Sequence, residues 1–395
     1  MERLDNMQVK ISDYLWFQEG PGVRNTQYTE SGVKLLNVAN LVDGKVDITN
    51  TSRYISEEEA YGKYKHFLVD DGDFIIASSG IKVEYFDKKM GFVTLDQLPL
   101  CMNTSTIRFK VIDKDKLNIR YFMYYLKSDE FKEQLARQIT GSAQLNFGPS
   151  HLKKMTMPII DLNAQNELVA NLDFVESLIT SRQEQLAKLD ELVKSRFIEL
   201  FGAIKDTVPL AYYISALSAG KSLAGEEDCP NKVLKTGAAT YDYFDPTQVK
   251  NLPSDYTPIE EHRVKTGDVI ISRMNTAELV GAAAYVWAAP SNTYLPDRLW
   301  RAEIKDNANP IFVWQLLIQS STKENIRRIA SGTSGSMKNI SKPGLLGISV
   351  KKVDFSAQNE FAAFVEHTDK LKLAIQESLA ELETLKKALM QKYFG

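Results

Sequence analysis

The chain has 395 residues, of which 44% are hydrophobic and 25% charged, and its formal net charge is −3. This length predicts two or three domains rather than one core. No apolar run approaches the roughly 18 residues of a membrane span, and the net charge gives no sign of a uniformly basic nucleic-acid-binding protein.

The N-terminal segment MERLDNMQVK has no apolar signal-peptide core, and the cysteines are Cys101 and Cys229. Two isolated cysteines indicate neither a disulfide framework nor a zinc site. We therefore expect a cytoplasmic protein that has no contact with a membrane.

The basic residues are unevenly distributed. Residues 101–160 contain ten Lys/Arg against five Asp/Glu, and residues 298–352 contain ten against three. Two basic regions in a nearly neutral chain are typical of a protein that meets phosphate on chosen faces, although an ordinary solvated surface would look the same.

Several elements occur twice, in the same order and about 190 to 195 residues apart. Gly72-Asp73-Phe74-Ile75-Ile76 is echoed by Gly267-Asp268-Val269-Ile270-Ile271, and both predict a turn that leads into a buried strand. Residues 104–112 and 296–304 predict a second strand in each half. Residues 132–137 and 323–328 predict the last turns of an amphipathic helix, and each half then contains a small polar loop.

The longest repeated segments are 164–202 and 357–395. Both begin with Ala-Gln-Asn-Glu, end with Phe-Gly, and are identical at 15 of 39 positions. Their apolar residues recur at steps of three and four, as in a coiled coil. We expect N-caps at Asn163 and Ser356 and helix ends at Gly202 and Gly395. The predicted seam between the two helices contains Leu172, Ile179, Leu186, Leu189, Val193, Ile375, Leu379, Leu382, Leu385 and Leu389.

These observations predict an α+β protein with two pseudo-repeated mixed α/β domains, residues 1–163 and 203–356. Two long antiparallel coiled-coil helices, residues 164–202 and 357–395, would follow and separate them. A rigid rod between two similar domains is suited to hold two binding sites at a fixed distance. The alternative is a helical scaffold without DNA specificity.

This order of domains and helices resembles the specificity subunit of type I restriction-modification systems. The resemblance includes the repeated Ala-Gln-Asn-Glu helix starts, the helix text RQEQLAKLDELVKSRFIELFG, the Gly-Pro loop and strand in residues 19–46, and the loops GSAQLNF and GTSGSMKNI. It implies two target recognition domains, each reading half of a bipartite site on double-stranded DNA. It also implies helices that set the spacing and dock two methyltransferase subunits, with restriction subunits completing the complex. S-adenosylmethionine, ATP and Mg would then be bound by the partner subunits, and this chain would be non-catalytic.

Major-groove readers need Arg or Lys for guanine and Asn or Gln for adenine, while Lys, Arg, Ser and Thr anchor phosphates. Four loops in each half offer these types. The candidate DNA-binding residues are Gln18, Arg24, Ser78, Ser79, Lys82, Asn103, Ser142, Gln144, Asn146, Lys221, Ser222, Arg273, Asn275, Arg298, Ser334, Ser336, Lys338 and Asn339. The aromatic runs at 61–67 and 241–244 are expected to pack mainly in the core.

Enzymatic alternatives rest on weaker patterns. Asp297, Glu303 and Lys305 resemble a short metal-nuclease signature, which would need its acids gathered around one ion. AGKS at 219–222 lacks the first glycine of a phosphate-binding loop, because Ser215 stands there. His66, His151, His262 and His367 show no paired metal-ligand spacing.

Overall fold

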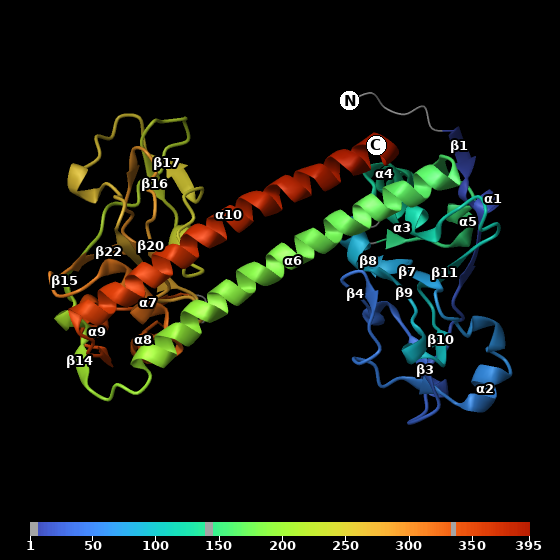
Figure 1. Ribbon diagram of the computed structural model, residues 1–395, viewed down its shortest axis with the longest axis horizontal. Helices are drawn as coiled ribbons and strands as arrows, with labels where there is room; N and C mark the ends of the chain where they lie inside the picture. Colours follow the sequence, from blue (N-terminus) through green and yellow to red (C-terminus); the bar gives the residue numbers. More distant parts are fainter. Residues whose placement is uncertain (1–6, 139–144, 333–336) are drawn as a thin grey trace. The chain divides into compact units, whose positions relative to one another are not determined.

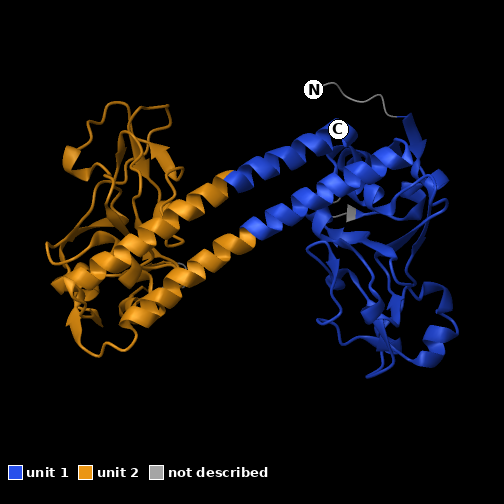
Figure 2. Ribbon diagram, viewed as in Figure 1, with its two compact units in different colours: residues 1–182, 378–395 blue, residues 183–377 orange. Residues whose placement is uncertain are grey.

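The computed structural model describes residues 7–138, 145–332 and 337–395. The chain divides into two compact units, coloured separately in Figure 2. Unit 1 comprises residues 1–182 and 378–395, and unit 2 comprises residues 183–377. The long helices α6 (Leu162–Phe201) and α10 (Phe355–Phe394), labelled in Figure 1, each contribute residues to both units.

Unit 1 is built around a sheet with the strand order β2-β11-β7-β9, in which neighbours run antiparallel. Its strands are β1 (Met7–Lys10), β2 (Leu15–Glu19), β3 (Val33–Leu36), β4 (Leu41–Val42), β5 (Lys45–Val46), β6 (Tyr54–Ile55), β7 (Phe74–Ala77), β8 (Ser79–Ile81), β9 (Met90–Phe92), β10 (Leu100–Met102), β11 (Thr106–Val111), β12 (Leu145–Asn146) and β13 (Thr156–Ile159). Its shorter helices are α1 (Ile11–Tyr14), α2 (Glu57–Tyr61), α3 (Ile119–Lys127), α4 (Asp129–Gln138) and α5 (Pro149–Leu152).

The core of unit 1 places α3 between this sheet and α10. Asn118 caps α3 by accepting a hydrogen bond from the backbone N–H of Arg120 at 2.8 Å. Phe122 meets Phe74 of the sheet edge to face at 6.4 Å between ring centroids. On the other side, the ring of Phe394 in α10 lies 5.0 Å from Tyr121 and 6.0 Å from Tyr125. The end of α10 therefore completes the core of unit 1.

Unit 2 has a corresponding sheet with the strand order β15-β22-β18-β20. Its strands are β14 (Thr207–Pro209), β15 (Ile214–Ser218), β16 (Lys232–Leu234), β17 (Val249–Asn251), β18 (Val269–Ser272), β19 (Met274–Asn275), β20 (Ala283–Tyr285), β21 (Thr293–Tyr294), β22 (Leu299–Ile304), β23 (Lys338–Asn339) and β24 (Ser349–Lys351). Its shorter helices are α7 (Pro310–Ile318), α8 (Ser320–Ile329) and α9 (Lys342–Leu346).

The core of unit 2 is organised by aromatic rings from three helices. Phe201 of α6 meets Phe312 of α7 and Phe361 of α10, each at 5.5 Å between ring centroids. Edge-to-face pairs of this kind contribute beyond the area they bury. The strands predicted around residues 72–76, 104–112, 267–271 and 296–304 are confirmed as β7, β11, β18 and β22.

The long helices begin slightly earlier than the sequence predicts. Asn163 and Ser356, the expected N-caps, lie inside α6 and α10. The cap of α6 is Asp161, whose carboxylate accepts a hydrogen bond from the backbone N–H of Ala164 at 3.0 Å. The expected caps are wrong because the repeated motif starts after the helix has begun. Within the described residues, no helix is long and apolar enough to cross a lipid bilayer.

Most of the predicted seam residues are at least half-buried. Leu172 and Val193 are buried, and the other predicted seam residues except Leu385 are half-buried. Leu385 is 48% exposed, which contradicts its place in the seam. In unit 1, Glu176 of α6 pairs with Lys386 of α10 at 2.8 Å. In unit 2, Asp190 pairs with Lys372 and Arg196 with Glu360, so the two helices run in opposite directions there.

Candidate nucleic-acid interface

In unit 1, three of the predicted loops meet at one end of the central sheet. The backbone N–H of Ser78, between β7 and β8, donates to the carbonyl of Ser105 at 2.8 Å, just before β11. The carbonyl of Ser78 accepts from the N–H of Phe147 at 3.0 Å, just after β12. Ser78 itself is fully buried, so we assign it to holding the loops together.

Exposed polar groups stand on this junction. Asn146 of β12 is the register partner of Ser79 in β8, and Asn146 is exposed. The hydroxyl of Ser79 donates to that of Ser105 at 2.6 Å. Lys82 follows β8 with its side chain 63% exposed, 3.6 Å from Glu84. A pair this exposed is weak, and therefore Lys82 can reach a phosphate.

Asn103 is also buried, with 2% of its surface exposed. Its side-chain oxygen accepts from the backbone N–H groups of Val23 at 3.1 Å and Thr104 at 2.8 Å, and its amide nitrogen donates to Asn37 at 2.9 Å. The expectation that Asn103 contacts DNA is therefore replaced by a positioning role. It fixes the loop that carries Arg24, whose side chain is exposed.

The same loop approaches Asn103 so closely that only glycine fits at residue 20. A Cβ atom there would lie 2.0 Å from the carbonyl oxygen of Asn103. Glu19, next to Gly20, is partly buried, and this burial raises the pKa of its carboxyl group above the ordinary value.

Gln18 is engaged inside unit 1. Its side-chain oxygen accepts from the guanidinium of Arg108 at 2.8 Å. Arg108 is 5% exposed and also donates to the carbonyls of Leu68 and His66 and to Asp73. Gln18 therefore belongs to the network of acceptors around a buried cation, which the residue pattern alone did not reveal. The interpretation of Gln18 as a DNA contact is not supported by this arrangement.

In unit 2, five predicted residues come together around the short pair β19 and β23. The backbone N–H of Arg273 donates to the carbonyl of Arg298 at 3.0 Å, and its guanidinium donates to Asn339 at 3.2 Å. In the strand pair, Asn275 lies opposite Lys338. Arg298 is exposed, and the other four side chains are half-buried. This cluster combines arginine and asparagine groups suited to base edges with a lysine suited to phosphate.

A glycine-led loop joins this cluster at Lys221 and Ser222. The hydroxyl of Ser222 is hydrogen-bonded to the carboxylate of Asp297 and accepts from the Asp297 N–H at 3.2 Å. A Cβ atom at Gly220 would lie 1.9 Å from the carbonyl oxygen of Leu295, the same close approach that Gly20 makes in unit 1. Lys221 and Arg298 are both exposed, and each is the sequence neighbour of one member of the Ser222–Asp297 pair.

Four predicted contact residues, Ser142, Gln144, Ser334 and Ser336, lie outside the described residues.

The residues proposed for a metal-dependent nuclease do not form one site. Asp297 is bonded to Ser222, the carboxylate of Glu303 accepts from Arg301 at 3.1 Å, and Lys305 donates to the carbonyl of Ala211 at 2.7 Å. Over residues 7–138, 145–332 and 337–395, no three His, Cys, Asp or Glu side chains are grouped to hold a metal ion. Burial raises the pKa of Cys101 to about 12, so this thiol stays protonated at neutral pH.

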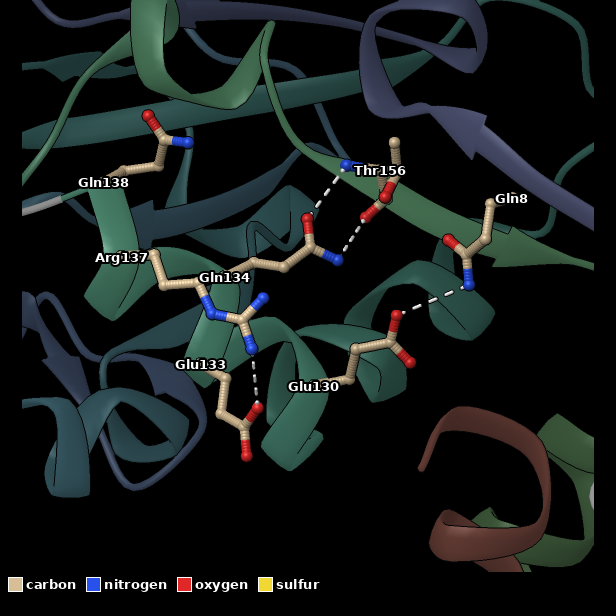
Figure 3. Close-up of a pocket in the computed structure, with 7 residues that line it drawn as sticks. All are labelled: Gln8, Glu130, Glu133, Gln134, Arg137, Gln138 and Thr156. Carbon is tan, nitrogen blue, oxygen red and sulfur yellow. Dashed lines mark hydrogen bonds and ion pairs between the residues drawn. The ribbon is translucent and has the colours of Figure 1, made fainter.

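A polar pocket of unit 1 differs in character from the loop clusters. Figure 3 shows Gln134 bonded to the backbone of Thr156, Gln8 to Glu130, and Arg137 to Glu133. Carboxylates in its wall repel phosphate, and the side chains of Gln8, Gln134 and Arg137 already donate to groups of the protein. The loop clusters are therefore the stronger candidates for meeting a polyanion.

The aromatic run at 241–244 was expected to pack mainly in the core, which is wrong for two of its residues. Tyr241 is 68% exposed and Tyr243 is 56% exposed. The backbone of Asp242 between them has a φ of +66°, and its carboxylate is turned inward to Lys323. Turning the middle residue inward directs its two neighbours outward.

The chain is similar in sequence and fold to known proteins. Residues 30–191 match the family model of the type I restriction modification DNA specificity domain. The specificity subunit of type I restriction enzyme MjaVIII from Methanocaldococcus jannaschii is 23% identical over 190 residues, covering 47% of this chain and 43% of that protein. The chain thus matches less than half the length of this curated relative.

Several solved structures match over the full chain, among them the following two. The S subunit of a type I restriction-modification system from M. genitalium has a TM-score of 0.62 at 15% identity, covering 100% of this chain and 98% of that one. A chain solved in work on complex assembly and conformational transition of the type I R-M system has a TM-score of 0.57 at 16% identity, covering 100% and 99%. At these identities the likeness establishes the fold.

The fold is therefore of the class found in type I specificity subunits. Residues 30–191 carry the sequence features of the type I restriction modification DNA specificity domain, and the resemblance predicted from the sequence is confirmed.

Proposed function

We propose that this chain is the DNA specificity subunit of a type I restriction-modification complex. The observation that carries the proposal is the convergence of loops in each unit. Around Ser79 in unit 1 and around Arg273 in unit 2, segments from separate parts of the chain meet beside one short strand pair. These junctions present the residue types that read base edges and anchor phosphates.

The two recognition domains, residues 1–163 and 203–356, would each read one half of a bipartite site. Their common plan supports descent from one duplicated domain. The sheet orders β2-β11-β7-β9 and β15-β22-β18-β20 correspond strand by strand, as do the pairs β8 with β12 and β19 with β23. Equivalent domains reading different bases would give one protein two independent half-sites.

The helical segments 164–202 and 357–395 would act as an antiparallel coiled-coil spacer and as the docking surface for two methyltransferase subunits. A 40-residue helix rises about 60 Å at 1.5 Å per residue. Two observations support this proposal. In unit 2, ion pairs join α6 to α10 with the helices running antiparallel, and in unit 1 Glu176 of α6 pairs with Lys386 of α10.

In this proposal the chain is non-catalytic. S-adenosylmethionine would be bound by the methyltransferase subunits, and ATP and Mg by partner subunits, with restriction subunits joining the complex. The engagement of Asp297, Glu303 and Lys305 in separate interactions supports placing the chemistry outside this chain.

A domain exchange tests the proposal. Residues 203–356 are replaced by the same region of a related subunit, the chimera is produced with its methyltransferase, and methylated adenines are mapped by sequencing. The expected motif keeps the half-site read by the first domain and acquires a new second half. Exchange of residues 1–163 serves as the reciprocal control. A motif in which both halves change together would contradict the assignment.

A further inference from the structure

Two tyrosine rings stand out on the surface of unit 2. Tyr241 and Tyr243 are 68% and 56% exposed, and their rings are nearly parallel, with 19° between planes and 6.4 Å between centroids. Single exposed apolar residues are common, but two aligned rings form a flat surface that packing within the protein does not explain.

The turn that carries the rings is held firmly. Asp242 has a φ of +66°, a conformation that L-residues rarely adopt. Its carboxylate accepts from the N–H of Ala283 at 3.2 Å and pairs with Lys323. Its carbonyl accepts from the indole N–H of Trp314 at 3.1 Å. Strained backbone that persists through several anchors is found mainly at functional sites.

The equivalent turn of unit 1 has no aromatic residue. Asp47 and Asp245 each close their turn by accepting hydrogen bonds from the N–H and hydroxyl of the threonine two residues later. When the two turns are aligned on Asp47 and Asp245, Asp43-Gly44-Lys45 corresponds to Tyr241-Asp242-Tyr243. Gly44 has a φ of +80°, like Asp242. The turn therefore forms without tyrosines, and their presence in unit 2 needs another reason.

The tyrosine turn adjoins the loop cluster of unit 2. The hydroxyl of Thr240, next to Tyr241, accepts from the amide of Asn275 at 3.3 Å. Lys323, which anchors Asp242, lies one helical turn before Arg327 in α8, and Arg327 donates to the carbonyl of Glu278 at 3.0 Å. The rings are thus connected to β19 and to the loop that follows it.

We propose that Tyr241 and Tyr243 form an aromatic contact with the DNA half-site that unit 2 reads, with their rings packed against sugars and thymine methyl groups in a groove of the duplex. This inference rests on the proposed function and adds an apolar contact to the hydrogen-bonding residues of the cluster. In duplex DNA, apolar side chains that include aromatic rings contact the thymine methyl group in the major groove. The contact belongs to the second half-site alone, because Asp43 and Lys45 occupy these positions in unit 1.

The test uses the complex of this chain with its methyltransferase and a duplex containing the target mapped by methylation sequencing. Affinity is measured for the wild type, for Tyr241→Ala/Tyr243→Ala and for Tyr241→Phe/Tyr243→Phe. We expect the alanine pair to weaken binding about 10-fold to 100-fold, because the apolar contact of the rings is lost. The phenylalanine pair should retain most of the affinity. Tyr212→Ala, which removes another exposed ring of unit 2, should bind like the wild type.

Two further measurements identify the contact between the tyrosines and DNA. The dependence of affinity on salt should be the same for the alanine pair and the wild type, because no phosphate contact is removed. Photo-crosslinking from 5-iodouracil should reach the 241–243 peptide from thymine positions of the second half-site and not from the first.

The possible outcomes separate the two proposals. A wild-type complex that does not bind its mapped target would overturn the proposed function itself. A wild-type complex that binds, together with an alanine pair of equal affinity and no crosslink, would overturn the tyrosine contact alone. Loss of methyltransferase from the alanine-pair complex, with crosslinks absent, would assign the rings to a protein partner and also overturn it.

Discussion

The side chain of Gln165 binds the backbone of Asn118, accepting a hydrogen bond from its N–H at 2.9 Å. Gln165 is fully buried, and its amide nitrogen donates to the carbonyls of Lys116 at 2.9 Å and Ile160 at 2.8 Å. One glutamine thus ties the first turn of α6 to the start of α3. These hydrogen bonds explain why glutamine is the second residue of the Ala-Gln-Asn-Glu motif.

The second copy of the motif makes the same connections. Gln358 accepts from the N–H of Asn309 at 3.0 Å and donates to the carbonyls of Asn307 at 3.2 Å and Val353 at 2.8 Å. The repeated motif is therefore the place where each long helix is hydrogen-bonded to the globular part before it. Its third letter adds to this fastening, since Asn166 accepts from the amide of Asn118 and Asn359 from that of Asn309.

Replacing Gln165 by alanine should destabilise unit 1 by on the order of 3 kcal/mol, because several buried backbone groups lose their partner. The change is read from the urea midpoint and from faster hydrogen exchange at Asn118. Asn166→Ala removes an exposed bond from the same fastening and should cost less than about 1 kcal/mol. Equal effects of the two substitutions would argue against a special role for Gln165.

The ion pairs of Glu176 should make the stability of unit 1 depend on acid. Burial by itself would raise the pKa of Glu176, but Lys127 at 3.2 Å and Lys386 at 2.8 Å outweigh it and hold the pKa below the ordinary 4.5. Because the pKa is lowered by folding, the stabilisation is present above 4.5 and is lost as the pH falls through the lowered value. Glu176→Gln should remove this part of the pH dependence of the urea midpoint. Glu184→Gln, at an exposed position of α6, should leave it unchanged.

Lys82 should contribute affinity without sequence preference. Its exposed ammonium group carries no paired donor and acceptor for a base edge, so we expect a phosphate contact. Lys82→Ala should weaken specific and non-specific DNA alike and reduce the slope of log affinity against log salt by about one. A loss restricted to one base of the target would instead make Lys82 a base reader.

Asn275 should behave in the opposite way. Its amide nitrogen, on β19, makes only long hydrogen bonds, to the hydroxyls of Thr240 at 3.3 Å and Ser272 at 3.5 Å, and an adenine edge can replace them. Asn275→Ala should relax specificity at one position of the second half-site, at a cost of about 1–3 kcal/mol for the cognate sequence. The salt slope should stay as in the wild type. Methylation mapping of the variant provides the measurement, and an unchanged motif would refute the assignment.

The spacer proposal predicts a change in target length. A seven-residue insertion after residue 182, matched by one after residue 379, adds about 10 Å to the helical pair. The distance between half-sites should then increase by about three base pairs at 3.4 Å each, while both half-sites keep their sequence. Insertion of seven residues into the 224–228 loop is the control. Unchanged spacing in the helical variant would contradict the role of the helices.

Elements with strong periodicity were predictable from the sequence. β7, β11, β18 and β22 follow from apolar runs next to turn residues, and the long helices follow from apolar steps of three and four. The caps Asn163 and Ser356 were wrong because local composition does not distinguish a polar residue before a helix from one in its first turn. Asp161 became visible as a cap only through its hydrogen bond to Ala164.

The loops of the candidate interface were also predictable, but the roles of single residues were not. Asn103 and Gln18 have the side chains of base readers, yet tertiary contacts with Val23 and Arg108 engage them inside unit 1. Conversely, Tyr241 and Tyr243 have side chains typical of a core. Their exposure depends on the inward turn of Asp242, which no pattern of residue types encodes.

The position of Phe394 has a consequence for synthesis. Its ring is 1% exposed and fills the space beside Tyr121 and Tyr125, although more than 260 residues are translated between Tyr125 and Phe394. During translation, the first unit therefore lacks the ring that covers Tyr121 and Tyr125 until the whole second unit has been synthesised. A premature stop codon upstream of Phe394 would leave Tyr121 and Tyr125 uncovered, so a lesion late in the coding sequence would expose the first unit to chaperones and proteases.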